Sequence, residues 1–284
     1  MTTASASAMF RPGLLDGQIV VVSGFGTGLG RASAVEMARL GATVIGCGRR
    51  PEPLAAVCEE IAAFGGKAEA ETLDIRDEAA VPAFFDKVME RHGRLDVLLN
   101  NAGGQFYGPA ETVTVKGLRT VVELNLLGTW SMTREAANKA FIPQKSGRVI
   151  SITASPHNGI AGFMATAAAR AAVENMTKSL SLEWGRFNIK LCAIAAGAFE
   201  TEVVAGKYPR EMIDSWGEMT SIGRIGRMDE MAWMVTYLAS PAADYITGSI
   251  LTMDGGRDNG LPPTPVHFSK EERKPKADVS ASAN

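Results

Sequence analysis

In the stretch Val20-Val21-Val22-Ser23-Gly24-Phe25-Gly26-Thr27-Gly28-Leu29-Gly30-Arg31-Ala32-Ser33, a β-branched run is joined to a helical pattern through a glycine-rich turn. Glycines permit positive φ and leave no Cβ between the backbone amides and a ligand, and the first amides of a helix attract a phosphate. The stretch therefore predicts a strand, a phosphate-binding turn and a helix in succession. The alternative is a tight connection that binds nothing, so the interpretation depends on the rest of the chain.

Length, composition and charge narrow the class of protein. A chain of 284 residues with 46% hydrophobic content fits one α/β domain with a large core. A formal charge of −2 gives no basic field for nucleic acid or a membrane surface. Cys47, Cys58 and Cys192 lack metal-ligand spacing, so we expect free thiols and no metal site. With no apolar run of transmembrane length, we expect a cytoplasmic protein without nucleic-acid or membrane partners.

Strand-like runs alternate with helical patterns along the chain. Helices of crossover length between strands predict a doubly wound parallel α/β sheet of seven strands, Rossmann-type, in a single domain. The expected strands are 18–23, 43–47, 68–73, 95–99, 148–152, 189–194 and 249–253. The expected helices are 30–40, 53–64, 78–92, 116–141, 162–184 and 229–238. We expect a flexible arm over 1–13, the domain over 14–260 and a tail over 261–284.

Three motifs occur in an order that fits this fold: Gly24-x-x-x-Gly28-x-Gly30, Asn100-Asn101-Ala102-Gly103 after the fourth strand, and Asp254-Gly255-Gly256 after the seventh. Together they resemble the short-chain dehydrogenase/reductase family over about residues 14–257. The resemblance implies a nicotinamide dinucleotide as cofactor and assembly into homodimers or homotetramers. It also implies cofactor contacts from Ser23, Gly24, Gly28, Leu29, Gly30, Asn101, Gly103, Gly197 and Thr201.

The residues after the second and third strands bear on the choice of cofactor. A carboxylate after the second strand would favour NAD, but Gly48 stands there and is followed by Arg49 and Arg50. Guanidinium groups suit a 2′-phosphate, which favours NADP(H) over NAD. The alternative is that both arginines are solvated loop charges. Asp74, after the third strand, is placed either to bond the adenine edge or to cap a helix.

The family's catalytic pair is missing from this sequence. Most members carry Tyr-x-x-x-Lys with a serine thirteen residues before the tyrosine, and a matching asparagine in the fourth helix. Aligned on Ala168-Ala169-Arg170-Ala171, this chain has Thr166 at the tyrosine, Arg170 at the lysine, Thr153 at the serine and Asn125 at the asparagine. A threonine does not titrate near neutrality and an arginine has a pKa above about 12, so neither relays a proton. Arg170 is still suited to hold the nicotinamide ribose.

One subgroup of the family lacks the tyrosine at this place. The chain resembles peroxisomal trans-2-enoyl-CoA and 2,4-dienoyl-CoA reductases in residues 100–106 and 168–171. That resemblance implies NADPH-dependent reduction of an activated C=C bond in an enoyl- or dienoyl-CoA thioester. Charge then collects on the thioester oxygen, where Thr153, Asn125 or Arg170 are candidate stabilising groups, and the proton goes to carbon, so a tyrosine is not required.

Other residues are candidates for the substrate region. His157, after the fifth strand, is either a general acid or a solvated loop histidine. Gln105, Phe106 and Tyr107 are expected at the substrate entrance, with plain packing as the alternative for Tyr107. Residues 207–216 are expected to form a lid. Ala196 replaces a proline that usually precedes Gly197, which leaves the role of Thr201 open.

Two further functions are compatible with the sequence. One is a redox-neutral dehydratase, hydratase or lyase acting on a ring or acyl-CoA substrate, with His157 as a catalytic group. The other is a catalytically silent nucleotide-binding subunit that forms a hetero-oligomer with a related chain through the helix 162–184.

Overall fold

A seven-stranded parallel sheet forms the centre of the molecule, in the order β3-β2-β1-β4-β5-β6-β7. The computed structural model describes residues 7–260. The predicted doubly wound Rossmann-type sheet in a single domain is confirmed. The strands are β1 Ile19–Ser23, β2 Thr43–Gly48, β3 Lys67–Thr72, β4 Val97–Asn100, β5 Gly147–Ala154, β6 Ile189–Ala196 and β7 Ser249–Met253.

Each face of the sheet has its own hydrophobic core. Successive side chains of a strand point to opposite faces, so Val20 and Val22 belong to one core while Ile19 and Val21 belong to the other. All four are buried. Burying such a side chain contributes about 1.5–3 kcal/mol, which explains why the central strands are continuous apolar runs.

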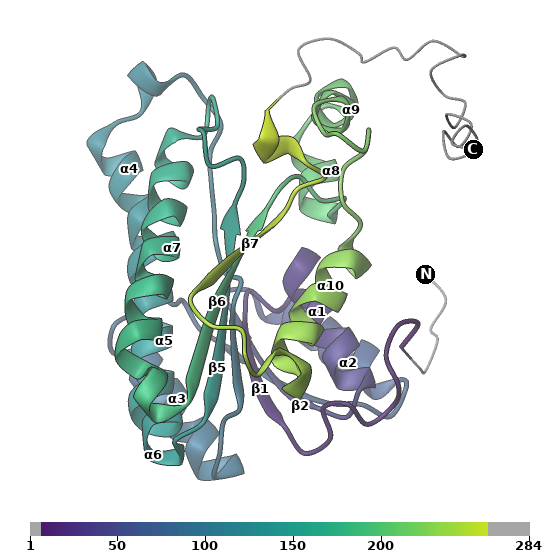
Figure 1. The fold of residues 1–284 in the computed structure, drawn as a ribbon, viewed down its shortest axis with the longest axis vertical. Helices are drawn as coiled ribbons and strands as arrows, with labels where there is room; N and C mark the ends of the chain where they lie inside the picture. The colour runs from purple at the N-terminus through teal and green to yellow at the C-terminus, as the bar shows by residue number, and fades with distance from the viewer. Residues whose placement is uncertain (1–6, 261–284) are drawn as a thin grey trace, which may run out of the picture.

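Helices cover both faces of the sheet (Figure 1). One layer contains α1, α2 and α10, and the other contains α3, α4, α5 and α7. The two cores include residues of all these helices except α4, which packs against α7 in a third, smaller cluster. The helices are α1 Gly28–Arg39, α2 Pro51–Ala62, α3 Ala80–His92, α4 Val115–Val122, α5 Gly128–Ala136, α6 Ile142–Gln144, α7 Met164–Trp184, α8 Glu202–Lys207, α9 Arg210–Glu218 and α10 Met228–Ala239.

Two predicted helices differ from the structure. The segment 116–141 is not a regular α-helix, because π-helical turns at Glu123–Leu127 and Ala137–Phe141 interrupt it. The helix expected from Gly162 begins at Met164, since Gly162 has a φ of +79°, which a right-handed helix excludes. The predicted lid 207–216 falls in two helices, α8 and α9, with a break at Tyr208 and Pro209.

Strands β5 and β6 run two residues further than predicted, to Ala154 and Ala196. They carry Thr153 and the residues before Gly197 to the carboxyl edge of the sheet. Part of the expected arm is described: the Ser7 hydroxyl donates to Glu36 of α1 at 2.5 Å. The first six residues and the tail 261–284 lie outside the described residues.

The cysteines are free thiols, as the sequence predicts. Burial raises the pKa of Cys47 to about 12, so this thiol stays protonated at neutral pH. Within residues 7–260, no helix combines the length and the apolar content needed to cross a bilayer.

Candidate active site

A cleft of about 720 Å³ opens at the carboxyl ends of the strands. Its lining comes from the turn after β1, the loop after β4, the segments after β5, β6 and β7, the start of α7, and both lid helices. Open α/β sheets bind ligands at this edge. Of the predicted cofactor residues, the cleft lining includes Gly24, Gly28, Leu29, Asn101, Gly103, Gly197 and Thr201.

The glycine turn is built so that backbone can approach backbone. A Cβ at Gly30 would lie 2.3 Å from the Gly24 carbonyl oxygen, and Gly24 has a φ of +69°. Asn101 Nδ2 donates to the carbonyl oxygens of Ser23 and Gly24 at 3.2 and 3.1 Å. The buried Ser23 hydroxyl accepts from the amides of Asn101 and Ala102. The first amides of α1 therefore face the cleft from a fixed cradle, which fits a pyrophosphate.

Arginines follow strands β2 and β3, where the sequence predicts the adenosine half of the cofactor. Arg49 and Arg50 are exposed and form no ion pair with any residue among 7–260. Asp74 is engaged by Arg76, whose guanidinium binds it through two nitrogens. Hydrogen bonds from Arg76 and the charge of Arg49 lower the pKa of Asp74. Asp74 does not cap α3, because Asp77 accepts the amides there. The sequence reasoning missed Arg76, which stands only two residues after Asp74.

The segment after β6 packs against the segment after β7. A Cβ at Gly197 would lie 2.7 Å from the Asp254 Cβ, so glycine is required for this contact. The Thr201 oxygen accepts from the Val204 amide at 3.1 Å and caps α8. The methyl of Thr201 faces Gly28, which brings the start of the lid beside the glycine turn.

Thr166 and Arg170 lie one turn apart on α7, but only Thr166 lines the cleft. The Thr166 hydroxyl forms no hydrogen bond with any described residue.

Arg170 lies beneath Gly103, where a Cβ added to Gly103 would be 2.0 Å from Arg170 Nη2. Its Nη1 donates to the Ile152 carbonyl at 2.7 Å. Burial lowers the pKa of Arg170 to about 10, below the value of about 12 expected from the sequence, because the charged form loses hydration. Arg170 still carries its charge at neutral pH.

Two other predicted catalytic residues are engaged by the protein itself. Thr153 is buried and donates its hydroxyl hydrogen to Glu174 Oε1 at 2.7 Å. Asn125 is fully buried in the first π-helical turn. Its Nδ2 donates to the carbonyls of Gly104 and Val121, and its oxygen accepts from the Gly104 amide. Neither residue belongs to the cleft lining, and Asn125 instead holds the loop after β4 in place.

His157 also lies outside the cleft lining. Its ring nitrogens contact Glu174 of α7 and Asp258, which follows β7. The hydrogen bond with Asp258 and the charge of Glu174 raise the pKa of His157. The sequence reasoning missed both carboxylates. Glu174 stands four residues after Arg170, so the two share a face of α7. This spacing is a signal from which Glu174 could have been predicted.

Aromatic side chains line the part of the cleft where the sequence predicts the substrate entrance. Tyr107 packs on Phe163 with a centroid separation of 5.2 Å, and Phe163 contacts Tyr208, which contacts Trp216 at 5.0 Å. All four line the cleft, together with Gln105. Phe106 does not, because its ring lies toward Gly117 of α4. Phe163 and Tyr208 were not singled out from the sequence.

The lid is tied to both sides of the cleft. Arg31 of α1 donates to Glu202 at 2.9 Å on the glycine-turn side. Lys207 Nζ donates to the Gln105 carbonyl at 2.8 Å on the substrate side. The ion pair between Arg31 and Glu202 is a surface pair, which contributes less than about 1 kcal/mol.

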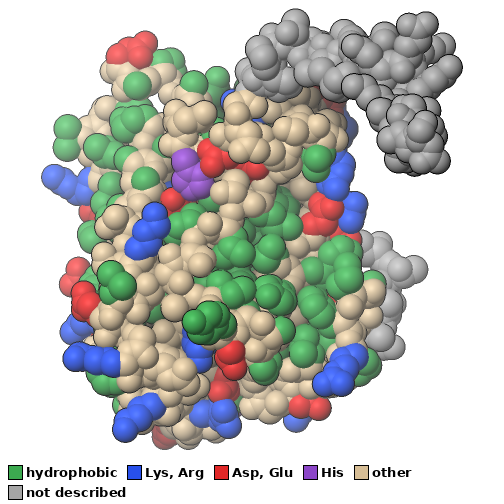
Figure 2. All heavy atoms as spheres, in the orientation of Figure 1, with side chains coloured by type: hydrophobic (Ala, Val, Ile, Leu, Met, Phe, Trp, Pro, Cys, Tyr) green, Lys and Arg blue, Asp and Glu red, His purple; other side chains and the backbone are tan. Residues whose placement is uncertain are grey.

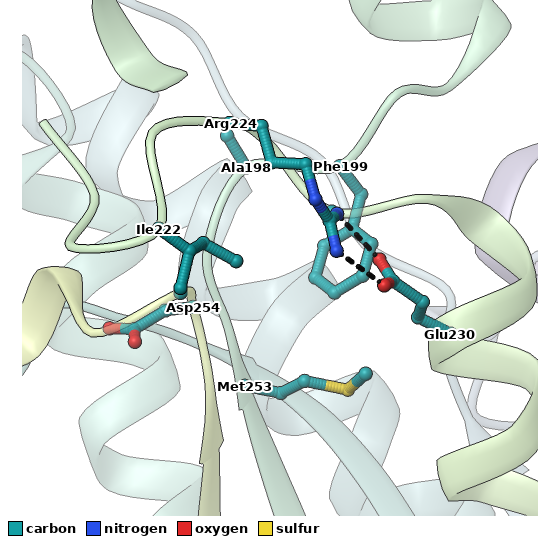
Figure 3. Close-up of a pocket in the computed structure, with 9 residues that line it drawn as sticks. Ala198, Phe199, Ile222, Arg224, Glu230, Met253 and Asp254 are labelled. Atoms are coloured by element: carbon teal, nitrogen blue, oxygen red, sulfur yellow. Dashed lines mark hydrogen bonds and ion pairs between the residues drawn. The ribbon is translucent and has the colours of Figure 1, made fainter. Parts of the chain in front are cut away.

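A smaller hollow of about 120 Å³ lies behind the cleft, between the ends of β6 and β7 and the segment that leads to α10. Figure 3 shows Arg224 and Glu230 pointing toward each other, with Phe199, Ile222 and Met253 around the hollow. Asp254 borders both cavities.

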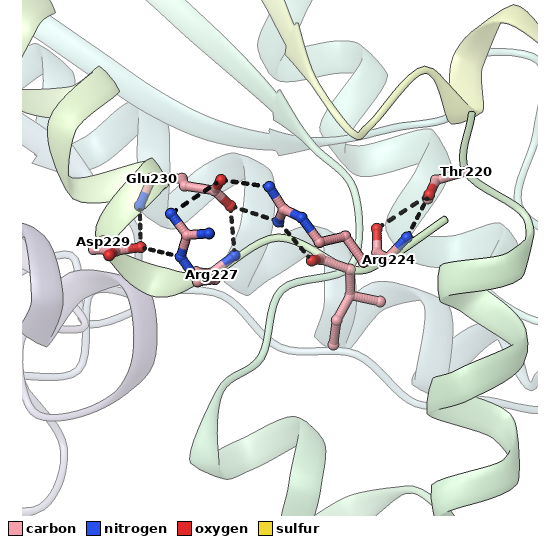
Figure 4. A network of polar contacts seen from close by, with 6 residues as sticks. Thr220, Arg224, Arg227, Asp229 and Glu230 are labelled. Atoms are coloured by element: carbon pink, nitrogen blue, oxygen red, sulfur yellow. Dashed lines mark hydrogen bonds and ion pairs between the residues drawn. The ribbon is translucent and has the colours of Figure 1, made fainter. Parts of the chain in front are cut away.

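The Arg224 guanidinium binds Glu230 through two nitrogens, at 2.7 and 2.9 Å, and lowers the pKa of Glu230 to about 2. Glu230 also accepts from the Arg227 amide at the start of α10, while Thr220 bonds the Arg224 backbone (Figure 4). This network anchors the chain where it leaves the lid.

Comparisons with known proteins fit this geometry. Residues 24–258 match the sequence model of a family described as "Enoyl-(Acyl carrier protein) reductase". The rat protein "Peroxisomal 2,4-dienoyl-CoA reductase [(3E)-enoyl-CoA-producing]" is 34% identical over 258 residues, covering 89% of this chain and 88% of its own. A Bacillus subtilis protein named "Probable 2,4-dienoyl-CoA reductase [(2E)-enoyl-CoA-producing]" is 34% identical over 247 residues, covering 86% and 97%. The structure of a citronellol catabolism dehydrogenase from Pseudomonas aeruginosa superposes with a TM-score of 0.80 at 33% identity, covering 88% and 98%.

Proposed function

The chain belongs to the short-chain dehydrogenase/reductase family, and we propose that it uses NADPH to reduce an activated C=C bond of an enoyl- or dienoyl-CoA thioester. It is an oxidoreductase of the enoyl-reductase type. The observation that carries the proposal is that Thr166, which the alignment sets in place of the family's tyrosine, lines the cleft. The names of the dienoyl-CoA reductase relatives point to the same chemistry.

The proposed reaction needs no titrating hydroxyl. The chemistry that the bound nicotinamide supplies is hydride addition to the β-carbon of the alkene. Negative charge then collects on the thioester oxygen, where a neutral hydroxyl stabilises it by donating a hydrogen bond. Thr166 is placed for this role because its hydroxyl forms no hydrogen bond with any residue that the structure describes. Arg170 adds positive charge below Gly103 without entering the cleft.

The other predicted catalytic groups act indirectly in this proposal. Asn125 holds the loop that carries Gly103 and Gly104, and Thr153 binds Glu174 rather than substrate. The proton that reaches carbon comes from water. Tyr107 and Tyr208 line the cleft as parts of the aromatic wall, where they contact the acyl group.

Absorbance at the nicotinamide band tests the reaction. We expect NADPH oxidation with trans-2-enoyl-CoA or 2,4-dienoyl-CoA thioesters and little with simple ketones. Absence of oxidation across a panel of such thioesters, or faster turnover of ketones, would overturn the proposal.

The cofactor preference has its own test. We propose that Arg49 and Arg50 bind the 2′-phosphate of NADPH, with Arg76 beside them holding Asp74. Arg49→Ser is expected to weaken NADPH binding by roughly tenfold, as loss of a charge-assisted hydrogen bond does, and to leave NADH binding unchanged. Equal effects on the two nucleotides would contradict this assignment. The matched control is Arg94→Ser, whose arginine pairs with Asp96 before β4.

We also propose a cytoplasmic homodimer or homotetramer. Figure 2 shows hydrophobic side chains gathered over β7 and α10, with basic and acidic groups interspersed elsewhere on that face. Tyr245, between these two elements, is fully exposed. Sedimentation at micromolar concentration is expected to give a dimer or larger, and a monomer would contradict the proposal.

A further inference from the structure

His157 lies between two carboxylates that come from different elements. Its Nε2 is 3.0 Å from Glu174 Oε2 on α7, and its Nδ1 is 2.5 Å from Asp258 Oδ2 after β7. The His157 backbone amide also donates to Asp258 Oδ1, at 2.6 Å. One residue thus connects the loop after β5 with α7 and with the segment after β7.

The geometry selects the protonated ring. A neutral imidazole has one N–H and one bare nitrogen, so it satisfies only one of two carboxylates. The imidazolium donates to both. Glu174 is buried, and an unpaired buried carboxylate is costly, so this side chain depends on its two partners, His157 and Thr153. The ionisable groups that act on His157 are Glu174 and Asp258, and no third one does within residues 7–260.

The loop that His157 belongs to forms part of the cleft wall. Pro156, Gly159, Ile160 and Ala161 all line the cleft. Across residues 156–161, His157 is the one residue that is hydrogen-bonded to another element within the described part of the chain. The next bond from this wall to another segment is at Gly162, whose carbonyl oxygen accepts from the Gly108 amide at 3.1 Å. His157 therefore fixes the position of the wall between Ser155 and Gly162.

We propose that His157, held as an imidazolium between Glu174 and Asp258, is a positioning residue that fixes the substrate wall of the cleft. This inference rests on the proposed function, because the wall faces the proposed acyl-thioester site. The residue acts on substrate affinity and not on proton transfer, since it lies outside the cleft lining.

The sign of the pH effect follows from the charges. Because the pKa of His157 is raised above its ordinary value of 6.5, the interaction is complete below that value. It is lost as pH rises through the raised pKa, because the neutral ring leaves one carboxylate facing a bare nitrogen. Substrate affinity is then expected to fall over the same range.

Steady-state kinetics with NADPH and a trans-2-enoyl-CoA test the proposal. His157→Gln is expected to raise the KM for the thioester by at least about fivefold, the lower end of typical coupling between sites, with kcat little changed. It is also expected to remove the rise in KM with pH that we expect of the wild-type enzyme. An unchanged KM, or a loss confined to kcat, would overturn the proposal.

Two further variants test whether the change in KM is specific to the interactions of His157 and does not come from misfolding. Asp258→Asn removes one carboxylate at a half-buried position and is expected to shift the rise in KM to lower pH, whereas an unshifted profile would count against the proposal. The matched control is His92→Gln, because His92 also contacts a glutamate, Glu69, but at the far end of α3. Its KM and pH profile are expected to match the wild type, and a change as large as that of His157→Gln would overturn the proposal.

Two measurements need no turnover and separate this inference from the proposed function. Nitrogen NMR of the histidine rings is expected to show His157 mostly protonated at both nitrogens at pH 6.5, because its pKa is raised above that value. Amide exchange across residues 156–163 is expected to be faster in His157→Gln than in the wild type. A neutral ring, or unchanged exchange, would overturn the positioning role even if thioesters are reduced. A protonated ring and faster exchange in a protein that reduces no thioester would refute the proposed function alone.

Discussion

Replacing Arg170 by methionine is expected to lower activity without lowering stability. Burial lowers the pKa of Arg170 to about 10. At about 1.36 kcal/mol per pKa unit, that fall corresponds to roughly 3 kcal/mol of unfavourable burial of the charge. The cost applies at every pH below the folded value, so it is present in full at neutral pH. Arg170→Met removes this cost and leaves the Ile152 carbonyl without its donor, which costs about 1–3 kcal/mol.

The burial cost that the substitution removes and the cost of the lost hydrogen bond nearly cancel in the free energy of unfolding. We expect the free energy of unfolding to stay the same or to rise by up to about 2 kcal/mol, which corresponds to a Tm gain of at most about 4 °C. In contrast, kcat for thioester reduction is expected to fall by tenfold to roughly a hundredfold, because a preorganised charge below Gly103, which lines the cleft, is lost.

Thermal unfolding and NADPH oxidation on the same preparation measure both effects. A Tm fall of more than about 5 °C would mean that Arg170 holds the fold together, and an unchanged kcat would mean that its charge is not used. Arg148→Met is the matched control. Arg148 lies on β5 and pairs with the exposed Asp244, so its loss should cost less than about 1 kcal/mol and leave kcat unchanged.

Substitutions at three further positions, Gly30, Thr166 and Tyr208, test the cleft. Gly30→Ala places a Cβ 2.3 Å from the Gly24 oxygen and should abolish NADPH binding by calorimetry, whereas Gly185→Ala, with open space around it, should not. Thr166→Ala should lower kcat by about a hundredfold, whereas Thr166→Ser should keep most of the wild-type kcat. Equal kcat values for the two variants would show that the hydroxyl takes no part in the reaction. Tyr208→Phe should retain kcat within about threefold, since an aromatic wall needs the ring and not the hydroxyl; a fall of about a hundredfold or more would identify Tyr208 as the acid instead.

The fold was predictable because its signals are local and repeated. Apolar runs such as Val20–Val22 mark strands that are buried on both faces, and the glycine turn marks the first crossover. The sequence did not predict the interruptions of the helices, because these have no strong local signature. The π-helical turn at Glu123–Leu127 keeps helical periodicity on either side, and the positive φ of Gly162 is visible only in the folded backbone.

The sequence predicted where residues of the candidate site lie better than it predicted which residues they contact. Alignment of motifs placed Thr166 and Gly103 at the cleft, where the structure has them. It could not tell that Thr153, Asn125 and His157 are engaged elsewhere, because their partners come from other elements of the chain. Hydrogen bonds between distant segments, such as Thr153 with Glu174, depend on how β5 packs against α7 and leave no trace in either segment alone.

Thr166 in place of tyrosine and Arg170 in place of lysine both fit the proposed reduction of an activated alkene. A carbonyl group that accepts hydride becomes an alkoxide and needs a proton on oxygen, which a threonine does not readily give up. An activated alkene needs a proton on carbon, and its oxygen needs only a stabilising donor and a nearby cation. Thr166 offers the donor at the cleft, and Arg170 keeps its charge below Gly103 despite full burial. Because that charge is maintained against an opposing burial cost of roughly 3 kcal/mol, its presence fits a role in the proposed reaction better than a role in the stability of the fold.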